Sequence, residues 1–252
     1  MKVKINSNKR IGKIIYIVEG DVDEAELIVK IYNQLLGYSI VKYCKITNKY
    51  TEMVNSKDKY SKVYIIPSEY SAVNKLLGST KYLDEIYHKL AIDYELDIDN
   101  AAIYYLFDRD RKNNRPADIT DLMNKLGNSR DNDDFEMNGL LLLSYPSIEA
   151  FYTNANDDSV RLDSGINAKE YIKEYKTLDL NSKMLEIGAK ILLSKLEHVE
   201  GKTFDHSWLD HFSDVNVDFF DYDETEFSNN KNYDTLSFIF VSFIDIGIIE
   251  IE

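Results

Sequence analysis

The stretch that decides the fold is Ile14–Leu36, IIYIVEGDVDEAELIVKIYNQLL. The apolar, largely β-branched run Ile14–Val18 predicts a buried strand, and the apolar residues of 22–36 recur at helical spacing. A buried strand that turns directly into a helix is typical of an α/β fold with a mostly parallel sheet. Ligands of such sheets bind at the carboxyl ends of the strands, where Glu19 stands in this chain.

Length and composition limit the class of protein. With 252 residues, of which 44% are hydrophobic, the chain can bury a large core as one domain or as one domain with an appendage. Cys44 is the only cysteine, which excludes an intrachain disulfide, and no Cys/His spacing typical of a metal site occurs. The basic N-terminus lacks the apolar segment of a signal peptide. We therefore expect a cytoplasmic protein.

The net charge of −14 bears on the possible partners. It argues against a protein that holds nucleic acid through bulk electrostatic attraction, since each neutralised phosphate needs a cation. It does not argue against a metal-dependent nuclease, because bound cations reverse the local sign of a cluster of carboxylates. A basic partner subunit would have the same effect.

Apolar periodicity places the remaining elements. Strands are expected at 39–46, 62–67, 101–107 and 140–143, and a polar connection at 49–59. Helices are expected at 71–77, 81–96, 118–126, from 148, at 168–175 and at 183–196, whereas 128–136 should be a loop and 204–232 has weak periodicity. We expect an α/β domain over 1–155 and a mainly helical region over 156–252.

The last stretch, 235–251, is very apolar, but Asp245 interrupts it and a membrane span needs about 20 apolar residues. We expect a core helix or a buried strand there, with an oligomer interface as the alternative, and no contact with a membrane.

Acidic residues follow three of the predicted strands. Glu19 follows the first, Asp108 and Asp110 follow 101–107, and Glu149 lies just past 140–143. Carboxyl ends of parallel strands meet at one edge, where carboxylates repel one another unless cations neutralise them. Hard oxygen ligands at this density suit Mg²⁺ or Mn²⁺, and Asp23, one helical turn past Glu19, can reach the same ion.

Each of these acids also has a plainer interpretation. The pattern D-x-D occurs five times in this acidic chain, and most such pairs are solvated loop residues. Only Asp108 and Asp110 follow directly on an apolar run. Asp23 is favoured in a first helical turn by the helix dipole alone, and Glu149 can be a surface residue at a helix start.

Three segments carry a resemblance to a known family. VEG at 18–20 and FDRD at 107–110 resemble the Toprim fold, which has a Glu-Gly turn after its first strand and D-x-D after a later one. SYPSIEAFY at 144–152 is similar to the corresponding stretch of OLD-type nucleases and of small Toprim effectors of bacterial anti-phage defence (abortive infection). The resemblance covers about residues 12–155 and implies an insertion at about 45–95.

The resemblance implies a Toprim endonuclease that hydrolyses phosphodiester bonds of DNA or RNA, tRNA among the possible substrates. It implies one or two Mg²⁺ ions at Glu19, Asp108 and Asp110, with Asp23 and Glu149 completing a second site. Lys202 either corresponds to the distal lysine of OLD-type sites or is a surface lysine. Arg109, between the two aspartates, either serves the developing charge on phosphorus or forms a salt bridge.

Two partner hypotheses accompany this reading. The motif G-x-x-x-x-G-K-[ST] does not occur, so any control by ATP needs a separate ATPase or regulatory subunit, and a homo-oligomer is a further possibility. The alternative function is a non-catalytic interaction or regulatory subunit with a degenerate Toprim core, which substitution of Glu19 or Asp108 by alanine would distinguish from an enzyme.

Overall fold

The computed structural model describes residues 2–19, 23–43, 50–68, 88–96, 100–109, 111, 115–130, 139–158 and 160–252. The helix predicted at 71–77, the first part (81–87) of that predicted at 81–96 and most of the loop at 128–136 lie outside these ranges, as does Asp110.

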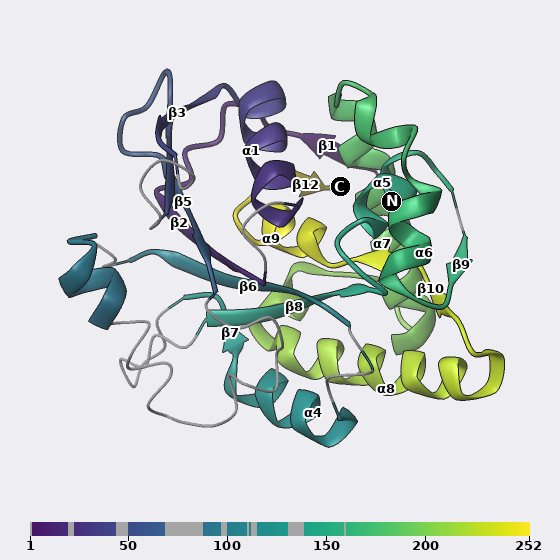
Figure 1. Cartoon of the computed structure of the whole chain (residues 1–252). Coiled ribbons are helices and arrows are strands. Elements are labelled where there is room, and N and C mark those ends of the chain that lie inside the picture. The colour runs from purple at the N-terminus through teal and green to yellow at the C-terminus, as the bar shows by residue number, and fades with distance from the viewer. Residues whose placement is uncertain are drawn as a thin grey trace.

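A mostly parallel sheet forms the centre of the molecule, as predicted (Figure 1). Its four parallel strands are, in spatial order, β5 (Lys62–Pro67), β2 (Lys13–Val18), β6 (Ala102–Asp108) and β8 (Gly139–Tyr145). Three antiparallel strands extend the ends of this row: β4 (Thr51–Asn55) and β3 (Tyr38–Lys42) beyond β5, and β11 (Leu236–Ser237) beside β8. The parallel strands are buried almost throughout, which explains their continuous apolar sequences.

Helices cover both faces of the sheet (Figure 1). α1 (Asp23–Leu36) and α9 (Ile239–Asp245) lie on one face, where the buried Tyr16 hydroxyl is 3.0 Å from both Tyr32 Oη and Ser242 Oγ. α4 (Pro116–Lys125) and α8 (Phe212–Asn230) lie on the opposite face, and the Asn216 side-chain amide donates to the Leu141 carbonyl at 2.7 Å.

The C-terminal region is mainly helical, as predicted. It contains α6 (Gly165–Tyr171), the short helix η3 (Tyr175–Thr177), α7 (Ser182–Glu200) and the short helix η4 (His206–His211), and it follows α5 (Ala150–Ala155). Two small antiparallel strand pairs involve this region. β9 (Arg161–Leu162) pairs with β10 (Tyr233–Asp234), and β12 (Ile249–Ile251) pairs with the N-terminal strand β1 (Val3–Ile5). Residues on both sides of position 155 share one continuous hydrophobic core.

Two segments contain elements that the sequence did not predict, and a third, 235–251, contains both of the kinds of element that were expected there. The polar connection at 49–59 contains strand β4, and 204–232 contains the 19-residue helix α8. The apolar stretch 235–251 forms both a helix, α9, and two strands, β11 and β12. A short strand that was not expected, β7 (Gly127–Asn128), lies beside β8. Within the helix predicted at 81–96, the described part contains the π-helical turn η2 (Lys89–Asp93). No helix in the described ranges combines the length and the apolarity that crossing a membrane requires.

Candidate metal and phosphodiester site

The predicted meeting of strand ends is present in the structure. β2 pairs with β6 up to Val18 and Leu106, and β6 pairs with β8 up to Asp108 and Ser144. Glu19, Asp108 and Glu149 therefore lie at the same edge of the sheet, and we call these three residues the acidic edge.

Two backbone hydrogen bonds tie the acidic edge together. The Asp108 backbone N–H donates to Oε2 of Glu19 at 2.9 Å, which links the ends of β2 and β6. The Ile148 N–H donates to Oδ1 of Asp108 at 2.8 Å, which links β6 to the turn after β8. Burial raises the pKa of Asp108 well above its usual range, and the neighbouring carboxylates of Glu24, Glu19 and Glu149 raise it further.

Glu149 is a buried carboxylate with spare bonding capacity. Its side chain is 1% exposed and stands at the N-terminal cap of α5. Oε2 accepts a hydrogen bond from Ser147 Oγ at 2.7 Å, whereas Oε1 is buried without a hydrogen-bond partner among the described residues. A carboxylate oxygen in this state is costly unless a cation lies near it.

Two lysines from the C-terminal region supply positive charge beside the acidic edge. Lys169 of α6 and Lys176 of η3 donate to Asp23 at 2.9 and 3.0 Å, and their Nζ atoms lie 3.9 and 3.6 Å from Oε1 of Glu149. Burial alone would raise the pKa of Asp23, but the bonds from both lysines outweigh it and lower that pKa. The structure thus places Asp23 beside Glu149, with the ammonium groups of two lysines already bound to it.

A cleft opens beside the acidic edge. Its volume is about 460 Å³, which lies in the range of ordinary ligand pockets. Its walls combine acids, cations and aromatic rings: Glu19, Asp108, Arg109, Arg111, Pro146, Asp163, Ser164, Gly165, Ile166, Lys169, Phe227 and Tyr233. A smaller pocket of about 180 Å³ lies on the side of Asp23, Glu149 and Lys176.

The structure does not bring Lys202 to this site. Lys202 follows the C-terminal end of α7, where its Nζ is 3.4 Å from Glu200 and 5.4 Å from the ring centroid of Trp208. These contacts match the surface-lysine alternative. Arg109 is buried in a salt bridge to Glu224, with Nη2 to Oε1 at 2.7 Å, as the salt-bridge alternative expected.

The residues that sequence reasoning missed are Lys169, Lys176 and Glu24. Lys169 and Lys176 lie 146 and 153 positions from Asp23 in the chain, so no local pattern pointed to them. Glu24 is 7% exposed, and burial raises its pKa, as do the charges of Asp23 and Glu149.

The ligand chemistry of the acidic edge is the type that hard divalent cations prefer. The acidic edge offers carboxylate oxygens from three strand ends, and Oε1 of Glu149 is buried without a hydrogen bond. As they stand, the described residues contain no group of three or more His, Cys, Asp or Glu side chains gathered closely enough to hold a metal ion. Asp110, the further ligand that the sequence predicts, lies outside the described ranges.

Comparison with known proteins adds no relative: no family model, no curated protein and no solved structure matches this chain. The class that fold and site define is therefore an α/β protein with carboxylates collected at the carboxyl ends of three neighbouring parallel strands.

Proposed function

We propose that the chain is a divalent-metal-dependent nuclease that hydrolyses phosphodiester bonds, as its resemblance to Toprim nucleases implies. The observation that supports this most strongly is the acidic edge. Carboxyl groups gathered at three adjacent strand ends, one of them the buried Glu149, repel one another and are costly to a fold. A site for Mg²⁺ or Mn²⁺ would account for their presence.

Glu19, Asp108 and Glu149 would hold the cation, joined by Asp110. A divalent cation bound there would polarise the phosphodiester and favour ionisation of an attacking water. The hydrogen bonds from Asp108 N–H and Ile148 N–H fix the orientations of the Glu19 and Asp108 carboxylates before any ligand binds. In the reaction, the water oxygen bonds to phosphorus, the P–O bond to the leaving oxygen breaks, and that oxygen gains a proton.

Lys169 provides charge for the substrate. It lines the cleft beside Glu19 and Asp108, and its side chain is 52% exposed. Asp23 holds its ammonium group at 2.9 Å, within reach of both the acidic edge and the open cleft. This placement suits contact with a non-bridging phosphate oxygen.

The test compares wild type with Glu149→Gln in the cleavage of labelled DNA and RNA with added Mg²⁺, and in calorimetric titration with Mn²⁺. The isosteric amide keeps the acceptor for Ser147 but removes the charge. We expect cleavage to fall by at least 100-fold and Mn²⁺ binding to weaken at least 10-fold, a typical cost for loss of metal-site support. Asp121→Asn on the exposed face of α4 is the matched control. Unchanged cleavage and unchanged Mn²⁺ affinity in Glu149→Gln contradict the proposal.

One observation favours a second candidate function. Lys169 and Lys176 already neutralise Asp23 and approach Glu149, as expected in a degenerate core that binds no metal. In that case the chain is an interaction or regulatory subunit. Titration of the wild type separates the two, because the regulatory candidate predicts no Mn²⁺ binding at millimolar concentration.

A further inference from the structure

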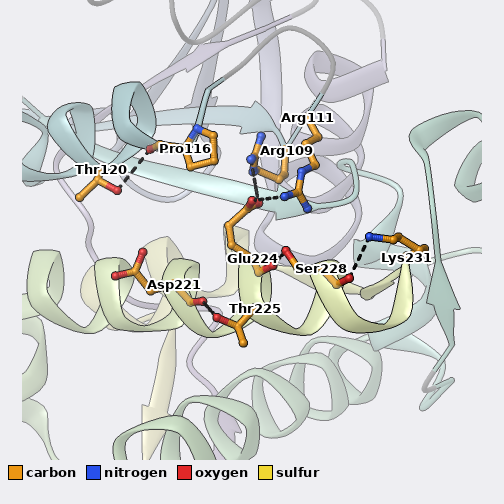
Figure 2. A network of polar contacts seen from close by, with 9 residues as sticks. All are labelled: Arg109, Arg111, Pro116, Thr120, Asp221, Glu224, Thr225, Ser228 and Lys231. Atoms are coloured by element: carbon orange, nitrogen blue, oxygen red, sulfur yellow. Dashed lines mark hydrogen bonds and ion pairs between the residues drawn. The ribbon is translucent and has the colours of Figure 1, made fainter.

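Two arginines beside the acidic edge share one carboxylate. Glu224 projects from α8 toward the segment after β6, where it meets both Arg109 and Arg111 (Figure 2). Oε1 lies 2.7 Å from Nη2 of Arg109, and Oε2 lies 3.1 Å from Nη2 of Arg111. The three side chains together carry one unit of excess positive charge.

The two arginines differ in how firmly they are held. Arg109 is 1% exposed and donates two hydrogen bonds to Oε1 of Glu224, from Nε at 3.0 Å and from Nη2 at 2.7 Å. Arg111 has a side chain 33% exposed, and its contact with Glu224 is an ion pair without hydrogen-bond geometry. Its Nη1 has no hydrogen-bond partner among the described residues. Arg109 is thus a structural anchor, whereas Arg111 is partly exposed and carries one buried donor, Nη1, that has no partner in the part of the chain that the structure describes.

Aromatic rings support the Arg111 guanidinium. Its Cζ lies 4.4 Å from the ring centroid of Phe227, which in turn lies 4.4 Å from that of Tyr233. A guanidinium stacked on a ring is fixed in plane while its N–H groups point outward along the edge. Tyr233 is 1% exposed, and its hydroxyl is buried without a hydrogen-bond partner within the described ranges. Arg111, Phe227 and Tyr233 line the same cleft as Glu19 and Asp108.

Another acid of α8, Asp223, does not cancel the excess charge. Asp223 of α8 is 1% exposed, and burial, followed by repulsion from Asp234 and Glu224, raises its pKa to about 8. Asp223 is therefore mainly neutral near pH 7, so that Glu224 is the acid of α8 that pairs with the two arginines.

From this arrangement we propose that Arg111, stacked on Phe227 beside Tyr233, is an anion subsite that binds a phosphate of the substrate strand next to the bond that is cut. The subsite deepens the nuclease proposal and rests on it for the identity of the strand. A guanidinium edge presents paired donors that match phosphate oxygens. A chain of net charge −14 needs such a local cation to hold a polyanion beside its own carboxylates.

The experiment measures binding without cleavage. Fluorescein-labelled 15-nucleotide single strands of DNA and of RNA are titrated with the full chain in EDTA, at several salt concentrations, and anisotropy is recorded. For Arg111→Gln we expect affinity about 10-fold weaker at low salt, as for loss of a charge-assisted contact. The slope of log K against log salt should fall by about 0.7, the value for one phosphate contact on a single strand.

Two further variants make the test specific. Arg115→Gln removes an equally charged side chain that is 83% exposed and pairs with Asp118 on α4, and it should bind as wild type does. Arg111→Lys keeps the positive charge but loses the paired N–H donors of the guanidinium. The slope of log K against log salt should therefore equal that of wild type, and affinity should fall about 3-fold. This variant also decides the question if thermal melting shows that Arg111→Gln is unfolded.

The outcomes separate this proposal from the nuclease proposal. Wild-type affinity and salt slope in Arg111→Gln, or in Arg111→Lys where the glutamine variant is unfolded, overturn the subsite. So does failure of the wild type to bind either strand. Neither result touches the nuclease proposal, which is decided by Mn²⁺ binding and by cleavage in Glu149→Gln. Conversely, binding that depends on Arg111 without any cleavage would support the anion subsite and contradict the nuclease proposal.

Discussion

The backbone N–H of Asp108 donates a 2.9 Å hydrogen bond to Oε2 of Glu19, across the ends of two adjacent parallel strands. The bond fixes one carboxylate of the acidic edge through the backbone of the residue that carries another. Because both partners lie at strand ends, this geometry exists without any ligand. Substitutions at Glu19 therefore separate its structural role from its proposed role as a ligand.

Glu19→Gln should bind Mn²⁺ at least 10-fold more weakly than wild type, with little change in melting temperature, because the amide oxygen still accepts from Asp108 N–H. Glu19→Ala should lose about 1–2 kcal/mol of folding free energy in addition, since it leaves that donor unpaired. Calorimetry and urea unfolding give the two quantities. Equal Mn²⁺ affinity in wild type and Glu19→Gln would remove Glu19 from the ligand set.

The double substitution Lys169→Gln/Lys176→Gln should raise Mn²⁺ affinity severalfold, because both lysines compete with a cation for Asp23 and Glu149. Stability should change by less than about 1 kcal/mol per lysine, since both pairs are partly exposed. Lys173→Gln, an exposed lysine of the same segment, is the control. Weaker Mn²⁺ binding by the double variant than by the control would show that the lysines support the ion rather than compete with it.

Asp223 makes stability depend on pH. Burial raises its pKa from 3.8 to about 8, so that between these values the folded state binds more protons than the unfolded state. This contribution to the free energy of unfolding is therefore largest below pH 4, falls as pH rises and is lost by about pH 8. Asp223→Asn should be more stable than wild type at pH 8.5, by about 1–3 kcal/mol, with a smaller difference at pH 5.

Urea unfolding at both pH values measures this difference. Asp221→Asn on the exposed face of the same helix controls for the general effect of removing an acid. A destabilised Asp223→Asn at pH 8.5, with Asp221→Asn unchanged, would mean that the carboxylate is ionised and satisfied in the folded protein.

Gly188→Ala tests the packing of α7 against α9. A Cβ at Gly188 would lie 2.1 Å from Cζ of Phe240, a ring that is fully buried. Alanine gains about 1 kcal/mol in helix propensity, but the overlap should cost more, leaving a net loss of about 1–3 kcal/mol. Lys190→Ala, on an exposed position of the same helix, should change little. A stabilised Gly188→Ala would show that α9 is packed differently.

Much of the sheet followed from the sequence because buried parallel strands are continuous apolar runs, as at 62–67 and 101–107. Strand β4 did not, because it lies at the antiparallel side of the sheet. Only Thr51 and Met53 of its five residues are buried, within a polar segment.

Helix α8 was missed for a different reason. Its buried positions include Asn216 and Asp223 among the aromatic residues, which dilutes the apolar periodicity of 204–232. A tertiary contact explains Asn216, since its side-chain amide donates to the Leu141 carbonyl of β8.

The residues of the candidate site also differ in whether the sequence could predict them. Glu19, Asp108 and Glu149 could be grouped from the sequence because each follows a recognisable strand. The cations could not, because Lys169 and Lys176 reach Asp23 only through the docking of α6 and η3, and Arg111 gains its support from α8. The acids could therefore be found from local sequence patterns, whereas the positively charged residues beside them could be found only from the tertiary structure.

The most direct measurement of the central claim is anomalous diffraction from crystals of the full chain soaked in Mn²⁺. The account predicts an anomalous peak at the acidic edge, within about 2.0–2.4 Å of carboxylate oxygens of Glu19 and Asp108, and no peak in crystals of Glu149→Gln at the same concentration. Wild-type crystals without Mn²⁺ at this edge, with the lysines still bound to Asp23, would contradict it.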